Sequence, residues 1–482
     1  MGAQLRTVVA KGRLALLLGL VGAPAALAGA LGLPAAADTP ASPAGVACHA
    51  VLVKVRAKRW AWVPRTRRVH GRRVLLERNG KPLYVRVRVR YFKHKHVSVC
   101  VSATAGTAPA ASAGTGAGPQ PGPGAGSPEG VSHLEYVLAN GLISVYDIDR
   151  GFALVKTISL PQTNSQVRGV TVAPSTHLMF ISFGGDGPLN GSGNGSVLAY
   201  DLVSDRVAWE VRLATGVDSG QVSPDATRLY MPSGENTSSG IWNVLSTRAG
   251  ERIGAIQGGS GAHNTIASND GRFVYLGGRN SNYLDAYETA TGTVKAVGPL
   301  IGSVRPFTVN GSNTLAFTGA TGFDGFQVSQ IRTGKVLFTV SFGPVPKGFP
   351  FTAPSHGISL SPDERQLYVI DSVHKQVQFW DVSRVGEGLA PAQLGIVPVA
   401  GLSATEHPCV YDCGRSGWLQ LSSDGRLLFV GDSGEVIDTR TRTVVTTLAT
   451  LAQTKKSIEV DWQSGAPVAT SGRTGVGYIA GN

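Results

Sequence analysis

Residues 355–382, SHGISLSPDERQLYVIDSVHKQVQFWDV, contain the clearest copy of the pattern that decides the fold. Three apolar runs, HGISL, LYVID and VQFWDV, are separated by the polar turns SPDERQ and SVHKQ. The runs are rich in β-branched and aromatic residues, which suit pleated, half-buried strands, and Ser-Pro-Asp favours a tight turn. Because so small a unit leaves an apolar face uncovered, the pattern predicts further units like it along the chain.

The hairpin in this stretch recurs along most of the chain. Each copy has an apolar strand that ends in a polar residue, then a polar turn and a second apolar strand. The markers are spaced 42 to 57 residues apart, which brackets the length of a four-stranded propeller blade. A turn like SPDERQ precedes every copy except the first. The seven marker residues are Asp147, Asp201, Asn243, Glu288, Gln330, Asp381 and Asp438.

The first hairpin lacks the strand that precedes the others, and the end of the chain offers a replacement. KSIEVDW, residues 456–462, follows the seventh hairpin and has the pattern of a strand. A blade completed by both ends of the repeat region would close the ring and remove the exposed sheet edges. The sequence therefore predicts an all-β fold, a seven-bladed β-propeller closed by the C-terminal strand.

The phrases SPDERQLYVIDSVHKQVQFWDV and SSDGRLLFVGDSGEVIDTRTRTVV carry a family resemblance. They resemble the YVTN-type (YVTN repeat-like) bacterial β-propeller family, whose repeats have a Ser-Pro-Asp turn and an Asp-x-x-Thr-Gly hairpin. The resemblance covers about residues 133–478 and implies a seven-bladed propeller. It implies no single activity, because members and neighbours of this superfamily include binding proteins, lactonases and quinoprotein-like enzymes.

The N-terminus has the pattern of an export signal. Three basic residues precede an apolar centre that ends in small residues, and Ala35-Ala36-Ala37 fits a cleavage signal. Glycine and proline interrupt the apolar centre, which makes a membrane anchor the weaker interpretation. We therefore expect a signal peptide over residues 1–37 and a secreted or cell-envelope-associated protein with no transmembrane segment after cleavage.

The net charge of +13 is concentrated in one short segment. Residues 48–102 contain 16 lysines and arginines against one acid, Glu77, whereas residues 103–482 contain 25 against 29 acids. Basic and apolar residues alternate in this segment, which predicts a small β unit with one cationic face. Such a face suits an anionic cell-envelope polymer, although a solvated strand face explains it too; nucleic acid is disfavoured because no known binding module or stacking platform is present.

The remaining boundaries follow from composition. Residues 103–131 are rich in Ala, Gly, Pro and Ser and nearly uncharged, so we expect a flexible linker, with the propeller over residues 132–482. In an oxidising compartment the four cysteines are expected to form disulfides, with Cys48 joined to Cys100 around the basic unit and Cys409 joined to Cys413.

In a propeller the loops that lead into the innermost strands gather on one face, the usual ligand surface. Aligning these loops places a base or a histidine in six of the seven. Such a ring favours a bound carboxylate, phosphate or acidic sugar. The alternative is that these residues pair with acids of neighbouring loops. The candidate ligand-binding residues are Arg168, Asp218, His263, Arg305, His356, Arg415 with Trp418, and Lys456 beside Lys455.

Metal binding and catalysis have less support. His263, His356 and His407 are the candidate metal ligands, with Cys409 and Cys413 nearby in sequence, but this cysteine spacing is not that of a common zinc site. No Gly-x-Ser-x-Gly, His-Glu-x-x-His or dense carboxylate motif occurs in the chain. We therefore predict no cofactor.

The first functional hypothesis is an exported propeller that binds an acidic ligand or partner, with a cationic unit that contacts the cell envelope. We expect this protein to be a monomer. The alternative is a propeller enzyme, either a lactonase-like hydrolase or a metal- or quinone-dependent oxidoreductase. A lactonase-like site could be assembled from separate blades and leave no local motif. A purely structural cell-envelope protein is the third possibility.

Overall fold

The chain divides into two compact units, Met1–Pro121 and Gly122–Asn482. The predicted signal peptide and linker lie outside the described residues, apart from Gly130 and Val131 of the linker. Within the described ranges no helix has the length and apolar character that crossing a membrane requires. The computed structural model describes residues 46–64, 66–69, 72–75, 77–78, 81–82, 84–102, 130–188, 193–402 and 414–473.

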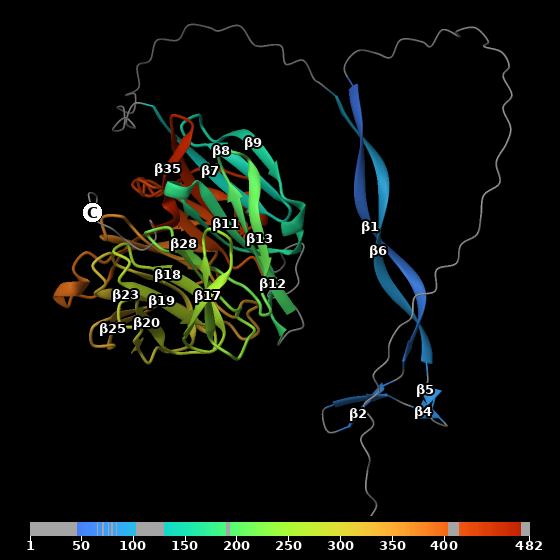
Figure 1. Ribbon diagram of the computed structural model, residues 1–482, viewed down its shortest axis with the longest axis horizontal. Helices are drawn as coiled ribbons and strands as arrows, with labels where there is room; N and C mark the ends of the chain where they lie inside the picture. The colour runs from blue at the N-terminus through green and yellow to red at the C-terminus, as the bar shows by residue number, and fades with distance from the viewer. Residues whose placement is uncertain are drawn as a thin grey trace, which may run out of the picture. The chain divides into compact units, whose positions relative to one another are not determined.

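The first unit is built on a long two-stranded antiparallel ribbon. β1 (Val46–Pro64) pairs with β6 (Tyr84–Ser102) over their full length, and Figure 1 shows the two strands winding about each other. The register places Cys48 directly opposite Cys100, as a disulfide between them would require, and the bond itself stays a prediction. Cys409 and Cys413 lie outside the described residues. Two short hairpins complete the unit: β2 (Thr66–Val69) with β3 (Arg72–Leu75), and β4 (Glu77–Arg78) with β5 (Lys81–Pro82).

The second unit consists of seven antiparallel sheets, as the repeat predicts. Six of them have four strands in chain order. They are β10–β13 (Val167–Ala173, Leu178–Gly187, Gly193–Asp201, Arg206–Arg212), β14–β17 (Gln221–Val222, Arg228–Pro232, Ile241–Ser246, Arg252–Gln257), β18–β21 (Ala262–Ala267, Phe273–Gly278, Leu284–Glu288, Val294–Val297), β22–β25 (Val304–Val309, Leu315–Ala320, Phe323–Gln330, Val336–Ser341), β26–β29 (Ile358–Leu360, Gln366–Asp371, Gln376–Asp381, Ala392–Pro398) and β30–β33 (Trp418–Leu421, Leu427–Gly431, Glu435–Asp438, Thr443–Thr447).

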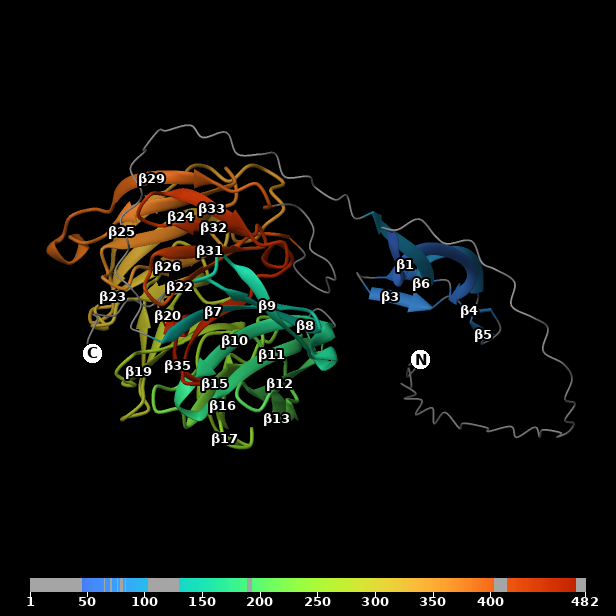
Figure 2. The same cartoon turned by 90° about the horizontal axis from the view of Figure 1, so that it is seen from above.

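The seventh sheet joins the two ends of the repeat region. β34 (Ser457–Gln463) pairs with β7 (Val131–Ala139), which is followed by β8 (Leu142–Asp147) and β9 (Ala153–Ser159). In Figures 1 and 2 the red C-terminal strands accordingly lie beside the cyan first strands. Closure by the C-terminal strand is therefore confirmed. A fifth strand, β35 (Ala466–Thr470), adds to the free side of β34 and was not predicted.

Side-chain hydrogen bonds explain the Ser-Pro-Asp turn. In the blade of residues 355–382, Ser361 Oγ donates to Asp363 Oδ1 and accepts the backbone N–H of Gln366. This local bonding replaces the backbone partners that the chain loses at the reversal. The same pattern recurs at Ser223, Ser268 and Ser422.

Six of the seven marker residues end the third strand of a blade, as predicted. The exception is Asn243, which lies inside β16; the strand ends at Ser246. Ser246 is equivalent to the marker residues of the other blades. Its carbonyl accepts the N–H of Gly250 across the turn, as the Asp438 carbonyl accepts that of Arg442. The serine was missed because the sequence pattern sought an acid or amide there.

The innermost strands surround a central channel. β10, β14, β18, β22, β26 and β30 contact one another in succession, and β34 contacts β10. Apolar side chains fill the space between neighbouring blades. Trp242 of β16, for example, is fully buried and its indole N–H donates to Thr265 of the next blade at 2.8 Å. Such packing fixes the blades against one another and so fixes the loops at the channel mouth.

Candidate functional site

The loops that lead into the innermost strands form one cavity, which we call the mouth. Six of the eight residues proposed from the sequence line it, and its volume is about 60 Å³. Arg168, His263 and Arg305 stand at the second position of β10, β18 and β22. The rest of the six come from loops just before an inner strand: Asp218, His356 and Lys456.

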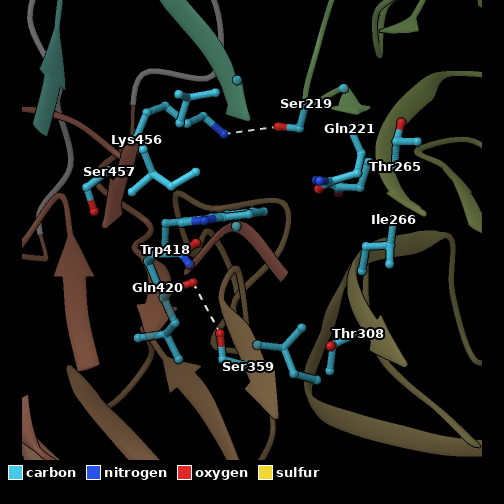
Figure 3. Close-up of a pocket in the computed structure, with 18 of the residues that line it drawn as sticks. Ser219, Gln221, Thr265, Ile266, Thr308, Ser359, Trp418, Gln420, Lys456 and Ser457 are labelled. Atoms are coloured by element: carbon cyan, nitrogen blue, oxygen red, sulfur yellow. Dashed lines mark hydrogen bonds between the residues drawn. The ribbon is translucent and has the colours of Figure 1, made fainter. Parts of the chain in front are cut away.

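Trp418 lies one level deeper than predicted. It begins β30 and lines a second cavity of about 110 Å³ inside the channel, formed by residues of all seven blades. Lys456 lines both cavities. In Figure 3 its amine reaches Ser219, at 3.1 Å, above the indole ring of Trp418. The Lys456 Nζ is 4.4 Å from the centroid of that ring, so lysine and indole together separate the mouth from the channel.

Arg415 is the one proposed residue that lines neither of these cavities. Its guanidinium donates to Gln453 Oε1 at 2.9 Å, and the next residue, Ser416, lines the mouth instead. The alignment placed the right loop at the mouth, but it could not give the direction of a long side chain.

The two histidines stack against each other in the wall of the mouth. Their ring centroids are 6.3 Å apart, and both side chains are buried. His263 Nδ1 lies 2.9 Å from Asp218 Oδ2, and His356 Nδ1–H donates to the Gly417 carbonyl at 3.0 Å. Both contacts involve Nδ1, as an ion pair at His263 and as a hydrogen bond at His356. Neither Nε2 has a hydrogen-bond partner among the described residues, although both are shielded from solvent.

Buried carboxylates balance much of the positive charge, as the alternative interpretation of the sequence expected. Glu235 Oε2 lies 3.3 Å from Arg279 and 3.4 Å from Arg305. Asp186 lies 3.3 Å from Arg168. These acids were not proposed from the sequence because neither belongs to an innermost strand or to the loop that leads into one. Asp186 lies near the end of β11, and Glu235 lies between β15 and β16. Lys455 similarly pairs with Asp432 at 3.0 Å.

Glycines allow the segments that carry these acids to approach one another closely. Gly234, directly before Glu235, has φ of +99°, and an added Cβ would lie 2.1 Å from the carbonyl oxygen of Asp186. At Gly216, before Asp218, an added Cβ would lie 2.3 Å from the carbonyl carbon of Asp186. No larger residue fits at either position without moving the backbone. The SGENTSS and TGVDSG segments therefore carry the local signal for this loop contact.

Burial and neighbouring charges shift the pKa values of three ionisable groups in the mouth, those of Asp218, Lys456 and His356. Burial would raise the pKa of Asp218, but the adjacent His263, with Arg168 and Lys456, holds it at about 2. Burial lowers the pKa of Lys456 to about 8. Burial, followed by the charges of Arg305 and Lys455, holds the pKa of His356 well below its usual range. At neutral pH His356 is therefore an uncharged ring with its proton on Nδ1.

The arrangement suits an anion better than a metal cation. Asp218, Glu235 and His263 have ligand atoms within 4.8 Å of one another, as a metal site needs. Two arginines already contact Glu235, however, and a cation would face Lys456 as well. His356 does not belong to this cluster, and the third candidate ligand, His407, lies outside the described residues.

Comparison with known proteins adds little beyond this geometry. No protein-family model matches the chain. No curated protein matches it either. Among solved structures it is similar to Kuenenia stuttgartiensis hydrazine synthase, at 14% identity and a TM-score of 0.48, over 62% of this chain and 90% of that one. The YVTN-type resemblance therefore stays a prediction, and the function has to be argued from the mouth.

Proposed function

We propose that the mouth binds a small anion that also carries a hydroxyl group, such as a 2-hydroxycarboxylate, a sugar acid or hydrogenphosphate. The observation that carries this proposal is the pair of buried Nε2 atoms of His263 and His356. Neither has a partner among the described residues, and both belong to a cavity lined by four lysines and arginines. Buried polar atoms of this kind normally have a partner, which a bound ligand would provide.

The hydroxyl group follows from the tautomer of His356. Because Nδ1–H donates to Gly417, Nε2 of the neutral ring carries a lone pair and accepts a hydrogen bond. A fully deprotonated anion offers only acceptors, so it would satisfy the cations and leave this nitrogen unpaired. A ligand with both a charged oxygen and an O–H donor satisfies the two requirements together.

The size of the mouth limits the ligand. A cavity of about 60 Å³ has room for roughly four to six water-sized groups. Hydrogenphosphate and lactate are of this size. A longer sugar acid would have to extend past Lys456 and Trp418 into the channel, where a further 110 Å³ is present.

Matched pairs of anions test this proposal by isothermal titration calorimetry at pH 7. Phosphate carries a proton at this pH and sulfate does not, and lactate differs from propionate by one hydroxyl. We expect phosphate and lactate to bind at least about tenfold more tightly than their counterparts, which is the value of one good hydrogen bond to a buried acceptor. His356→Phe should remove the preference, whereas His374→Phe, in another part of its blade, should keep it.

Two results would contradict the proposal. Equal binding of phosphate and sulfate, and of lactate and propionate, would show a mouth that responds to charge alone. Absence of binding by all four anions at millimolar concentration would reject an anion site of this size altogether.

We further propose that the basic unit holds the protein at an anionic cell-envelope polymer after export. The register of β1 and β6 pairs even-numbered positions with even-numbered ones, and six of the nine basic residues in these strands, at 54, 56, 58, 86, 88 and 90, are even-numbered. Binding to a soluble anionic polymer that weakens steeply between 50 and 500 mM salt would support this role, and salt-independent binding or no binding would oppose it.

A lactonase-like hydrolase is the second candidate, and the contact between Ser219 and Lys456 favours it. Lys456 Nζ lies 3.1 Å from Ser219 Oγ, and its lowered pKa of about 8 makes a neutral amine accessible. A neutral lysine can accept the proton of a serine that attacks an ester carbonyl. Turnover of lactones that is abolished by Ser219→Ala would support this candidate, and an inactive wild-type protein across a lactone panel would reject it.

A further inference from the structure

A second cluster of ionisable side chains lies at the seam where the ring closes, apart from the mouth. β7 and β34 pair there in antiparallel register, with His133 opposite Asp461 and Glu135 opposite Glu459. Because residues two apart on a strand share a face, all four belong to the same face of the closing sheet. One pair comes from the start of the propeller and the other from its end.

The cluster is compact and largely buried. His133 Nδ1 lies 2.9 Å from Asp461 Oδ1 and 3.2 Å from Glu459 Oε1. The side chains of Glu459 and Asp461 are 2% and 8% exposed, whereas that of His133 is 22% exposed. One ligand atom from each of these three residues lies within 4.8 Å of the other two. His133 therefore forms the solvent side of the cluster.

Glu135 supplies an independent observation. Its side chain is fully buried, and neither carboxylate oxygen makes a hydrogen bond of normal geometry among the described residues. Its neighbours across the strands are the carboxylates of Glu459 and Asp461. A buried carboxylate without a partner is unfavourable beside two others unless a proton or a cation neutralises it.

Among the described residues, few basic groups are placed to neutralise these carboxylates. Within the part of the chain that the structure describes, His133 is the basic group in ion-pair contact with these carboxylates. The other two clusters of this kind differ. Arg279 and Arg305 contact the carboxylate of Glu235 in the mouth, and two glutamine amides already donate to Asp371 in the cluster of Asp324, Asp371 and His374.

We propose that His133, Glu459 and Asp461, with the buried Glu135 carboxylate beside them, bind a divalent transition-metal ion that joins the first and last strands of the propeller. One imidazole and carboxylate oxygens form a mixed donor set that suits Mn²⁺ or Zn²⁺, whereas Ca²⁺ takes oxygen ligands. The ion would compensate the buried carboxylates, and the partly exposed His133 gives it a path from solvent. Both ends of the ring would supply ligands, so binding would stabilise its closure.

The test uses the full chain without a histidine tag, stripped with EDTA and then titrated with Mn²⁺ and Zn²⁺. Calorimetry should give one ion per chain, and the melting temperature should rise with metal concentration. Glu459→Gln should weaken binding at least about 100-fold and abolish the thermal shift, because it removes a direct ligand. Asp324→Asn, in a chemically similar cluster, should leave both unchanged. Glu135→Gln, further from His133, gives a milder second variant if Glu459→Gln does not fold.

Three outcomes would overturn the proposal. The first is that the stripped protein binds neither Mn²⁺ nor Zn²⁺ at 100 μM. Metal binding could survive in both Glu459→Gln and Glu135→Gln. It could also be lost in Asp324→Asn and kept in Glu459→Gln, which would place the ion in the other cluster. Each would show that His133 and the carboxylates form an ion-pair network with shared protons.

Discussion

The ammonium group of Lys456 lies 4.4 Å from the centroid of the Trp418 indole ring and belongs to the walls of both the mouth and the channel. Trp418 begins the inner strand β30, and Lys456 directly precedes the inner strand β34. Lys456 also donates to Ser219 across the channel at 3.1 Å. A single lysine therefore joins three blades at the position where a bound anion would meet the channel.

The charge of Lys456 predicts how anion binding depends on pH. Its pKa is lowered to about 8, so the ammonium form is lost as the pH rises through that value. Lactate stays ionised throughout, and its affinity should fall about tenfold between pH 7 and pH 9.5 as one charged hydrogen bond is lost. Lys456→Arg should keep the affinity constant over this range, and Lys375→Arg, distant from the mouth, should behave as the wild type. Calorimetry at a series of pH values measures this; a flat wild-type profile would exclude Lys456 from the site.

The turn at Ser361 predicts a loss of stability that depends on one hydroxyl group. Ser361→Ala leaves the N–H of Gln366 and the carboxylate of Asp363 without this partner in a partly buried turn. The free energy of unfolding should fall by about 1–2 kcal/mol, measured by urea denaturation. Ser383→Ala removes a similar hydroxyl bond to Asp381 on the exposed surface and should change it by less than about 0.5 kcal/mol. Equal effects of the two substitutions would contradict this account of the turn.

Asp324 predicts a stability that depends on pH. Burial, followed by the nearby charge of Asp371, raises its pKa from 3.8 to about 7. The folded state therefore binds the proton more tightly than the unfolded state, so this group's contribution to stability falls as the pH rises from about 4 to about 7.

Asp324→Asn mimics the protonated side chain and keeps an acceptor for Ser355. It should raise the free energy of unfolding at pH 8 by about 1–3 kcal/mol and flatten the dependence between pH 4 and 7. Asp225→Asn should act in the opposite direction at neutral pH, because the Ser223 hydroxyl lowers the pKa of Asp225. Thermal denaturation at a series of pH values measures the stability of both variants. Destabilisation by Asp324→Asn at pH 8 would contradict the assignment.

The closing strand predicts that the propeller does not tolerate loss of its C-terminal segment. A chain that ends at Gln453 lacks β34 and exposes the edge of β7 together with the apolar surface that Ile458 and Val460 cover. We expect it to aggregate or to unfold without a cooperative transition. A chain that ends at Arg473 keeps β34 and β35 and should unfold as the full-length protein does. Circular dichroism and size-exclusion chromatography compare the two; cooperative unfolding of the shorter chain would contradict the role of β34.

The repeated hairpin pattern predicted most of the fold. Hairpins such as that ending at Asp381 have local signals, because turn chemistry and strand alternation act within a few residues. The closing strand also had a signal, since the first hairpin lacked a partner and KSIEVDW supplied one. β35 had none, because it adds to the edge of a blade that already has four strands. The end of β16 was predicted at Asn243 instead of Ser246, because the pattern required an acid or an amide and a serine can end a strand equally well.

The candidate site was predictable only where it follows the inner strands. The positions of Arg168, His263 and Arg305 repeat from blade to blade, so an alignment of the repeats finds them. Glu235 lies in a loop between β15 and β16 and Asp186 near the end of β11, outside the aligned inner strands, and the direction of the Arg415 side chain depends on Gln453, a distant residue. The sequence therefore indicated the basic residues of the mouth and missed the acids that neutralise them.

By itself the sequence determined a seven-bladed ring, its closure by the last strand and the loops that form the mouth, because those features depend on local periodicity. Only the tertiary structure decided that His263 and His356 stack with their Nε2 atoms unpartnered, and that Glu135 and Glu459 meet across the seam. Both arrangements join residues from distant parts of the chain. Their charges interact through space in a buried environment, where the separation along the sequence has no influence.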